Sequence, residues 1–341
     1  MFKKRISLFL LIILGGQSVF SQIGGQSVYQ FLNLTMSPRQ AALGGKNITI
    51  YDHDVNQGAF NPASINPEMD NFLSVNYTNL YGELNHGTAN YAYVWDRRTQ
   101  TIHAGISYIN YGQFDGTDEV GNSTGSFSAS EGALSVGYAY NIPFSDFYVG
   151  ANAKLITSKL ESYSSIGAAL DLGVIYKDEK NDLIYSLVVR NFGTQFTTYA
   201  GLKERLPFEI LIGISQELEH VPLRWHITLE YLQQWNVRFS NPARSQASLD
   251  GGVVEEEVSF INNAMRHVIL GAELFPRKGF NLRLGYNFRR SQELSITDIR
   301  TFSGFTGGFG LKFGKLKFDY AYSRFTAASN VSMFGLTINL Q

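Results

Sequence analysis

The stretch Lys315-Leu316-Lys317-Phe318-Asp319-Tyr320-Ala321-Tyr322-Ser323-Arg324 alternates between two kinds of side chain. Its even positions are mostly apolar or aromatic, and its odd positions are charged or small. Because successive side chains of a strand point to opposite faces, this segment has one apolar and one polar face. Similar segments recur from about residue 72 to the C-terminus, with no strong helical segment between them. This repetition predicts a transmembrane β-barrel, whose outer face meets lipid and whose inner face meets water.

The predicted fold class is all-β, an antiparallel transmembrane β-barrel of about 14 strands with a small N-terminal helical plug. The connections alternate between short turns, such as 97–99, and longer segments, such as 113–125 and 235–264. Outer-membrane barrels have short periplasmic turns and longer outer loops, so both termini should be periplasmic and the outer loops should lie at the cell surface. We expect strands near 72–82, 86–97, 101–112, 126–141, 147–158, 164–177, 183–192, 207–218, 222–234, 265–275, 279–290, 304–313, 315–325 and 329–340.

The charges within the expected strands favour the same fold. Almost every strand with a charged residue in its middle places that residue on the predicted inner face. An Arg or Lys facing lipid at the midplane would cost about 2–4 kcal/mol. Lipid-facing positions include Ile106, Leu172, Leu284 and Phe318. Inward positions include His103, Asn152, Lys154, Asp171, Arg190, Glu209, Arg224, His226, Glu230, His267, Glu273, Arg283, Lys312, Lys317 and Asp319.

The sequence divides into three parts. Residues 1–21 combine basic residues at positions 3–5 with a short apolar run, which predicts a secretory signal peptide. Residues 22–70 are too few and too rich in glycine to hold a core of their own, so we expect a plug inside the barrel. Residues 71–341 form the barrel.

Ser37 to Gly45 predict a short helix within the plug. Ser37 is expected to cap its N-terminus, and Pro38 suits the first helical position. Gly44 and Gly45 suit the left-handed backbone that ends many helices. Asn61-Pro62-Ala63 predicts a turn. Together with Arg39, these are the motif residues of the plug: Ser37, Arg39, Gly44, Gly45, Asn61 and Pro62.

Composition narrows the function classes. The chain has 19 Tyr and 25 Phe, which suits the aromatic girdles of a barrel, and 33 Gly, which suits crowded positions in a lumen. It has no Cys and therefore no disulfide scaffold. Its net charge of -1 gives no indication of nucleic-acid binding.

Arg224, His226, Glu230, Glu273 and Arg283 form the main polar constellation of the predicted lumen. Such residues could bind a metal or act in acid–base chemistry, but a filled lumen needs paired charges in any case. We interpret them as a lumen network in which Arg224 pairs with Glu230, Glu209 or Glu273. Asp52-His53-Asp54 could bind a cation but is better explained as a polar turn. No catalytic residue, cofactor or metal site is predicted.

The segment 235–264 is the longest connection and mixes apolar with charged residues. Long loops without secondary structure are often functional, and exposed aromatic residues favour docking. Two interpretations stay open: a docking surface for a partner, and a cap that folds back over the barrel mouth. The candidate partner-binding residues are Trp235, Phe239, Val253, Val254, Glu255, Glu256 and Phe260.

The plug motifs carry a family resemblance. Tyr29 to Leu34, Ser37 to Gly45, Gln57 to Ala63 and Leu80-Tyr81-Gly82 resemble the FadL-like outer-membrane family, and within it the PorV/PorQ branch of the type IX secretion system. The resemblance implies a non-enzymatic barrel of a cell-surface attachment complex, embedded in outer-membrane lipid. It further implies that the barrel holds a PorZ-like surface protein, which works with a PorU-like sortase beside a PorV-like barrel.

Two other functions stay open. The broader family implies a transporter of hydrophobic or small solutes, which would need a lateral opening and a ligand pocket beside the plug. An outer-membrane hydrolase would need Ser, His and a carboxylate converging at one rim, and the sequence offers no such set.

Overall fold

The computed structural model describes residues 27–97, 99–237, 246–247, 253–254, 259–294, 303–324 and 330–341. Fourteen antiparallel strands close into one barrel, and a separate two-stranded sheet pairs β10 (Gln246–Ala247) with β11 (Val253–Val254). The predicted fold class and number of barrel strands are therefore confirmed. The predicted signal peptide lies outside the described residues.

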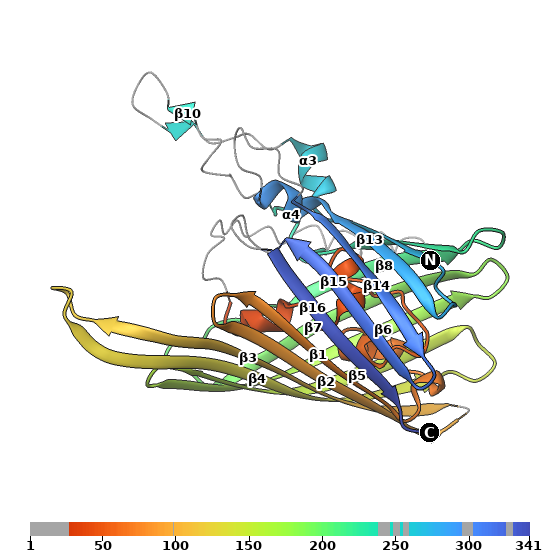
Figure 1. The fold of residues 1–341 in the computed structure, drawn as a ribbon, viewed down its shortest axis with the longest axis horizontal. Helices are drawn as coiled ribbons and strands as arrows, with labels where there is room; N and C mark the ends of the chain where they lie inside the picture. The colour runs from red at the N-terminus through yellow and green to blue at the C-terminus, as the bar shows by residue number, and fades with distance from the viewer. Residues whose placement is uncertain are drawn as a thin grey trace, which may run out of the picture.

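Neighbours around the barrel follow the chain, and β1 closes the circle by pairing with β16 (Figure 1). The strands are β1 (Phe72–Tyr81), β2 (Leu84–Asp96), β3 (Gln100–Thr117), β4 (Ser123–Asn141), β5 (Phe147–Leu160), β6 (Tyr163–Asp178), β7 (Leu183–Thr197), β8 (Glu209–Glu217), β9 (Leu223–Leu229), β12 (Val268–Leu274), β13 (Phe280–Asn287), β14 (Phe305–Phe313), β15 (Leu316–Arg324) and β16 (Asn330–Asn339).

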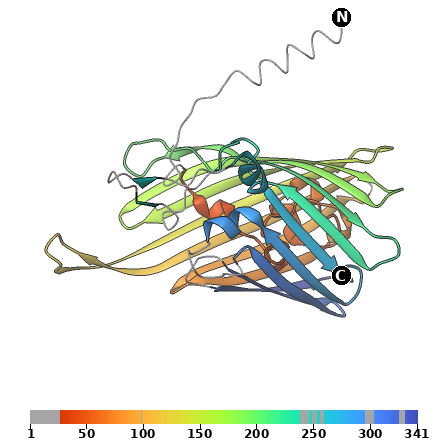
Figure 2. The same cartoon turned by 90° about the horizontal axis from the view of Figure 1, so that it is seen from above.

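The barrel has two unlike ends. Phe72, the first residue of β1, pairs with Asn339 near the C-terminus. The connections at this same end, which we call the turn end, are all short and follow β2, β4, β6, β8, β12 and β14. The longest connections, 198–208, 230–267 and 288–304, lie at the other end, which we call the loop end, together with the two-residue turns 82–83 and 161–162. Figure 2 shows the same barrel from above.

Burial alternates along the strands as the sequence predicts. On β13, Leu284 is 62% exposed whereas its neighbour Arg283 is 1% exposed. Lys154 and Lys317 point inward and are buried, and Phe318 lies on the outer face. A polar lumen inside an apolar wall is the arrangement that lipid outside and polar surroundings inside require. Among the described residues, no helix has the length and apolar character to cross a bilayer.

Several predicted boundaries are wrong. The strand predicted for 183–192 continues to Thr197 as β7, and the one predicted for 265–275 begins only at Val268 as β12. The segment 113–125 is largely strand, since β3 and β4 extend through it and reach beyond the neighbouring strands (Figure 1). The strand predicted for 279–290 ends at Asn287, whose side chain caps the helix α4 (Phe288–Glu293). The strand predicted for 222–234 ends at Leu229. The long connection after it contains the helix α3 (Phe260–Met265).

Residues 27–71 run through the lumen before β1 begins. This segment, which we call the plug, contains η1 (Gln30–Asn33), α2 (Pro38–Ala42), η2 (Val55–Ala59), η3 (Pro62–Ser64) and η4 (Pro67–Met69). It starts at the loop end, where the N–H of Val28 donates to the carbonyl of Arg205 in the connection between β7 and β8. It leaves at the turn end, so it crosses the whole lumen rather than folding as a compact domain.

The path of the plug places the first described residues and the C-terminus at different ends of the barrel, whereas the sequence predicts both termini at one end. The C-terminus lies at the turn end, next to the start of β1, where both termini are expected. The first described residues lie at the opposite end. The difference arises because the plug is extended along the barrel axis, so its two ends are separated by the length of the lumen.

Candidate functional site

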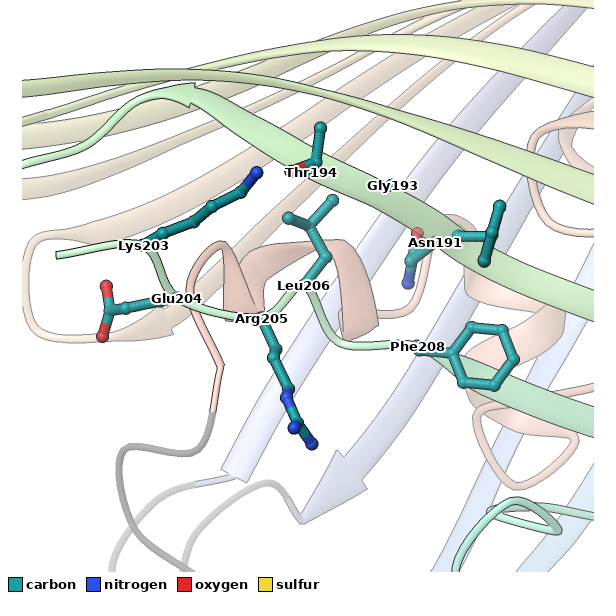
Figure 3. Close-up of a pocket in the computed structure, with 9 residues that line it drawn as sticks. Asn191, Gly193, Thr194, Lys203, Glu204, Arg205, Leu206 and Phe208 are labelled. Atoms are coloured by element: carbon teal, nitrogen blue, oxygen red, sulfur yellow. The ribbon is translucent and has the colours of Figure 1, made fainter.

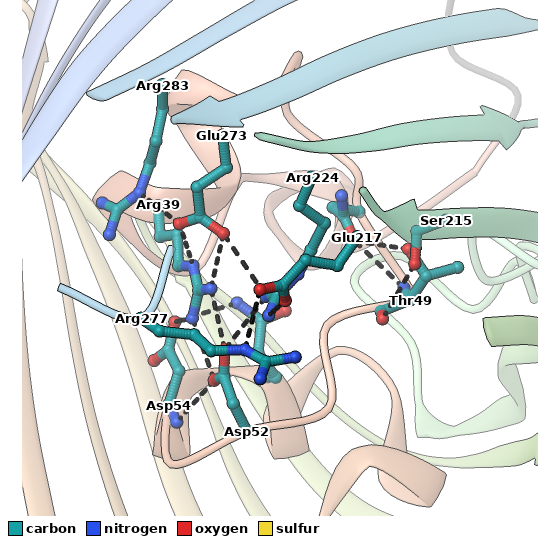
Figure 4. A network of polar contacts seen from close by, with 12 residues as sticks. Arg39, Thr49, Asp52, Asp54, Ser215, Glu217, Arg224, Glu273, Arg277 and Arg283 are labelled. Carbon is teal, nitrogen blue, oxygen red and sulfur yellow. Dashed lines mark hydrogen bonds and ion pairs between the residues drawn. The ribbon is translucent and has the colours of Figure 1, made fainter. Parts of the chain in front are cut away.

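Arg39 holds the middle of the plug to the barrel wall (Figure 4). It stands on α2, which begins where Ser37 accepts a hydrogen bond from the N–H of Gln40, as the sequence predicts. Its Nε and Nη2 atoms donate to the two carboxylate oxygens of Glu273 at 3.0 and 2.8 Å. Its Nη1 and Nη2 atoms donate to Asp52 at 2.9 and 2.8 Å. One guanidinium thus makes two bidentate pairs, the geometry that gives arginine its specificity for carboxylates.

Glu273 on β12 is shared by three arginines. Besides Arg39, it accepts from Arg283 Nε at 2.9 Å and lies 3.4 Å from Arg224 Nη1. Arg283 also donates to Asp319 at 2.6 Å. Arg39, Asp52, Arg224, Glu273 and Arg283 are named here the Glu273 cluster. The deeply buried carboxylate of Glu273 is tolerated because it is paired and hydrogen-bonded on several sides.

The two plug residues of this cluster stay charged. Burial by itself would lower the pKa of Arg39, but attraction to Asp52 and Glu273 raises that pKa well above its ordinary value. Burial also acts to raise the pKa of Asp52, yet Arg39 holds it well below the usual range. Asp54 lies 3.4 Å from Arg39 as well. The carboxylates of Asp52-His53-Asp54 are therefore engaged in holding Arg39.

A second group of charges lies nearer the loop end. Lys46 of the plug lies 2.5 Å from Glu209 and 2.9 Å from Glu230, and Arg289 of α4 lies 3.0 Å from Glu230. These four residues are named here the Lys46 cluster. Attraction to the two glutamates outweighs burial and raises the pKa of Lys46. The plug is thus held by ion pairs at two depths of the lumen.

The predicted lumen network is therefore divided in two. Arg224 pairs with Glu273, one of the three expected partners, and also with Asp52 and Glu217. Its expected pairing with Glu230 or Glu209 is wrong, because Lys46 reaches both of these carboxylates. His226 lies on the same strand, but its Nδ1 atom is 3.0 Å from the hydroxyl of Thr49 in the plug.

Glycines of the wall let the plug approach the strands closely. A Cβ atom at Gly150 on β5 would lie 2.2 Å from the carbonyl oxygen of Pro62, and one at Gly173 on β6 would lie 2.3 Å from Oδ1 of Asn61. Asn61 in turn donates to the carbonyl of Ile48 at 2.7 Å and to Ser186 on β7 at 3.0 Å. The motif Asn61-Pro62 is therefore fitted against bare backbone of the wall.

Gly44 and Gly45 end α2 with left-handed backbones, at φ of 94° and 103°. The N–H of Gly45 donates to the carbonyl of Gln40, and the N–H of Gly44 donates to Thr306 on β14 at 3.0 Å. A Cβ atom at Gly44 would lie 2.4 Å from the side chain of Ile269. Both the left-handed backbone angle and the lack of room for a Cβ atom favour glycine at position 44.

An opening in the wall lies between β7 and the connection that follows it (Figure 3). β7 pairs with β8 only up to Arg190, and Asn191 takes a left-handed backbone at φ of 56°. Beyond that point lies a cavity of about 540 Å³. We name it the wall pocket; its lining residues are Asn191, Phe192, Gly193, Thr194, Lys203, Glu204, Arg205, Leu206 and Phe208.

The candidate docking residues of the long connection are only partly described. Trp235 stacks on His267 with ring centres 5.3 Å apart, and its ring centre lies 5.2 Å from that of Phe260. Trp235, Phe260 and Ile261, which are 49%, 66% and 73% exposed, are named here the α3 patch. Phe239, Glu255 and Glu256 lie outside the described residues. Val253 and Val254 are described only as the backbone of β11.

Several site residues were not singled out from the sequence. Asp52 had been interpreted as part of a polar turn, Lys46 had no assigned role, and the wall pocket was not located. An Asp in a turn gives no sign of which cation it meets, because its partners, Arg39 on α2 and Arg224 on β9, stand on other elements of the chain. The glycines of the lumen carried a usable signal, since Gly150 and Gly173 fall on the inner face of their strands.

Comparison with known proteins indicates the fold. No family model matches the sequence, and no curated protein is significantly similar to it. The structure is similar to that of a FadL homologue from Pseudomonas aeruginosa, with a TM-score of 0.51 and 11% identity, over 93% of this chain and 100% of that chain. At this identity, the likeness concerns the fold alone.

Two other solved barrels overlap less well. LpxR from Salmonella typhimurium has a TM-score of 0.31 at 8% identity, covering 78% of this chain and 99% of that chain. Outer-membrane phospholipase A from Escherichia coli has a TM-score of 0.29 at 9% identity, covering 79% of this chain and 95% of that chain. The likeness to the FadL homologue and the closed 14-stranded barrel show that the protein has the fold of a FadL-type outer-membrane barrel.

Proposed function

We propose that the protein is a non-enzymatic outer-membrane barrel that anchors a surface protein at its loop end. On this proposal it is a PorQ-like member of the type IX secretion attachment complex. It holds a PorZ-like protein that works with a PorU-like sortase, beside a PorV-like barrel. The loop end faces the cell exterior and the turn end faces the periplasm. The resemblance of the plug motifs to the PorV/PorQ branch supplies the identity of these partners.

The observation that carries this proposal is the way the lumen is filled. The plug is held at two depths by the Glu273 cluster and the Lys46 cluster, and Phe60 of the plug packs under Arg190 with 3.7 Å from the guanidinium carbon to the ring centre. Breaking a buried ion pair by removing one partner typically costs about 3–5 kcal/mol. A plug fixed in this way suits a rigid anchor better than a channel that opens with each transport event.

The α3 patch supplies an exposed apolar surface at the loop end. Its three large side chains cluster around α3, at the mouth of the barrel rather than on the lipid-facing strands. Exposed aromatic and aliphatic clusters of this kind commonly mark sites of protein interaction. The patch belongs to the segment that the sequence singled out for docking.

The double variant Phe260→Ala/Ile261→Ala should still insert into the outer membrane but should bind the PorZ-like surface protein more weakly. Both side chains are mostly exposed, so their removal leaves the barrel intact. The amount of PorZ-like protein that co-purifies with the barrel from detergent-solubilised outer membranes should fall by roughly 10-fold, as expected when a hot spot is truncated.

Leu202→Ala is the matched control, because Leu202 is 79% exposed in another loop-end connection. It should leave the yield of partner unchanged. If the wild-type barrel retains no PorZ-like protein, the anchoring proposal is wrong. If the double variant retains as much as the wild type, the α3 patch has no part in anchoring.

The wall pocket favours a second candidate function, the uptake of a hydrophobic solute. The pocket lies at the wall beside β7 and is lined by Phe192 and Phe208, whose rings meet edge to face at 6.3 Å. Lys203 and Arg205 beside them could hold an acidic head group. A transporter of this kind would bind an amphiphile here.

A fluorescent long-chain fatty acid would test this function. If transport is correct, purified wild-type barrel should bind the probe with a saturable signal, and Leu206→Trp should block it by filling the pocket. Phe313→Trp, an exposed position at the turn end, serves as the control. Absence of saturable binding to the wild type would remove this candidate.

A further inference from the structure

Beyond the barrel rim, β3 and β4 continue as a free-standing two-stranded ribbon. Its strands are residues 113–117 and 123–128, joined by the turn 118–122, and we call this unit the ribbon. In Figure 1 it projects away from the other strands at the loop end. From Tyr108, an outward aromatic residue of the wall, to Phe114 is roughly 20 Å along the strand, at about 3.3 Å per residue. The ribbon therefore rises above the lipid-facing part of the barrel.

A β-bulge at the base of the ribbon reverses the faces of β3. Below it, Asn110 pairs with Ser130, and above it Gln113 pairs with Ser128, so β3 has one extra residue. One added residue sends every later side chain to the opposite face. The bulge is fixed in place: Gly112 has φ of 86°, and Glu83 accepts from the N–H of Gln113 at 3.2 Å.

The consequence is a reversal of polarity relative to the barrel. Phe114 pairs with Phe127, and both lie on the side that continues the inner face of the barrel, toward the mouth. The opposite side carries Gln113, Asp115 and Ser126. In the membrane the outer face is apolar and the inner face is polar, whereas in the ribbon the mouth-facing side is aromatic and the outer side is polar. Lipid cannot be the reason for this aromatic side.

The two rings form one exposed apolar platform. They stack with centres 5.4 Å apart and an angle of 25° between planes, and Phe114 and Phe127 are 42% and 37% exposed. Gly116 and Gly125 come next on the same side, and the hydroxyl of Thr124 lies close to where a Cβ atom of residue 116 would be. Rigid aromatic residues with this much free surface are typical anchors of protein interfaces.

The charge of the ribbon restricts what binds there. Residues 112–130 contain Asp115, Asp118 and Glu119 and no Lys or Arg. Asp118 is used within the turn, where its Oδ1 accepts from the N–H groups of Val120 and Asn122. Asp115, on the opposite side of the ribbon, and Glu119, in the turn at its tip, remain as exposed acidic groups. A partner surface with an apolar centre and lysine or arginine at its edge would be complementary.

We infer that the mouth-facing side of the ribbon is a docking surface for a secreted protein that presents an apolar patch rimmed by basic residues. This inference rests on the proposed anchoring function and names a second contact for the same partner. The ribbon and the α3 patch stand on opposite sides of the mouth, since β5 to β8 lie between β4 and β9 in the barrel order. A protein seated over the mouth would touch both.

The test uses full-length barrel in lipid nanodiscs and the purified PorZ-like protein of the proposed function. In Phe114→Ser/Phe127→Ser the dissociation constant should rise about 10- to 100-fold, the range for truncated hot spots. Phe144→Ser is the matched control, since Phe144 is fully exposed at the turn end, and it should bind as the wild type does. In Asp115→Asn/Glu119→Gln the dependence of affinity on salt should weaken, because the ribbon then carries less negative charge.

The outcomes separate the inference from the proposed function. Wild-type binding that persists unchanged in the Phe114/Phe127 variant overturns the docking surface while the anchoring function stands. No binding to the wild type overturns both. If instead the wild-type barrel is a dimer and the Phe variant a monomer, the occupant is a second copy of this chain and the inferred partner is wrong. An intact strand signal in circular dichroism confirms that each variant is folded.

Discussion

The Glu273→Gln variant should hold its plug more weakly than the wild-type protein by about 3–5 kcal/mol, the usual cost of leaving buried charges without their partner. Glu273 is completely buried and is the shared counter-charge of Arg39, Arg224 and Arg283. The neutral amide keeps the size of the side chain but leaves three guanidiniums close together. Arg39 and the plug segment around it should then leave the wall in a fraction of molecules.

Two measurements report this change. Thermal unfolding in detergent should occur at a lower temperature, and single-channel recordings in planar bilayers should show openings that the wild type lacks. Glu293→Gln is the matched control, because its pairing with Arg289 is a partly exposed contact within one helix. Such pairs contribute only about 0.3–0.5 kcal/mol, so the control should behave as the wild type. A closed, fully stable Glu273→Gln barrel would show that the cluster does not hold the plug.

A single methyl group at position 150 should also loosen the plug. In Gly150→Ala the new Cβ would lie 2.2 Å from the carbonyl oxygen of Pro62 and 2.4 Å from its carbonyl carbon. Both are backbone atoms, which cannot rotate away as a side chain can. We expect a loss of stability near the upper end of the 1–3 kcal/mol that is typical of overpacking, or about 3 kcal/mol.

Gly307→Ala separates this effect from the general cost of replacing a strand glycine. The nearest atom to a Cβ at Gly307 is 3.6 Å away, an ordinary contact. Limited proteolysis should cut the plug of Gly150→Ala faster than that of Gly307→Ala, because a displaced segment exposes its backbone. Equal cleavage rates in the two variants would show that the plug tolerates the added methyl.

The sequence predicted well those features that depend on local surroundings. The alternation in Lys315 to Arg324 reflects a wall between lipid and a polar lumen, and β15 lies where this pattern places it. Ser37 caps its helix because a cap involves only residues within one turn. Inward charges such as Arg283 were placed correctly for the same reason, since their face follows from the period of the strand alone.

The sequence was less informative wherever a contact joins distant residues. It placed Arg224 and Glu273 in one lumen but also allowed Arg224 to pair with Glu230, and it gave Arg39 no partner. The boundary of β3 was missed because the bulge after Asn110 interrupts the alternation, so the ribbon had the composition of a loop. Gln113, Phe114 and Asp115 show no period by which their faces could be assigned without the pairing to β4.

Residue spacing was enough to predict that the chain forms a barrel, which of its residues face lipid and where the plug helix begins, because each of these depends on only a few neighbouring residues. The folded chain was needed to show which charges meet, how the plug crosses the lumen and which side of the ribbon carries its aromatic pair. Arg39 and Glu273 are 234 residues apart in the chain. Many carboxylates face the lumen, and the choice among them depends on the path of the plug and on the register of every strand between.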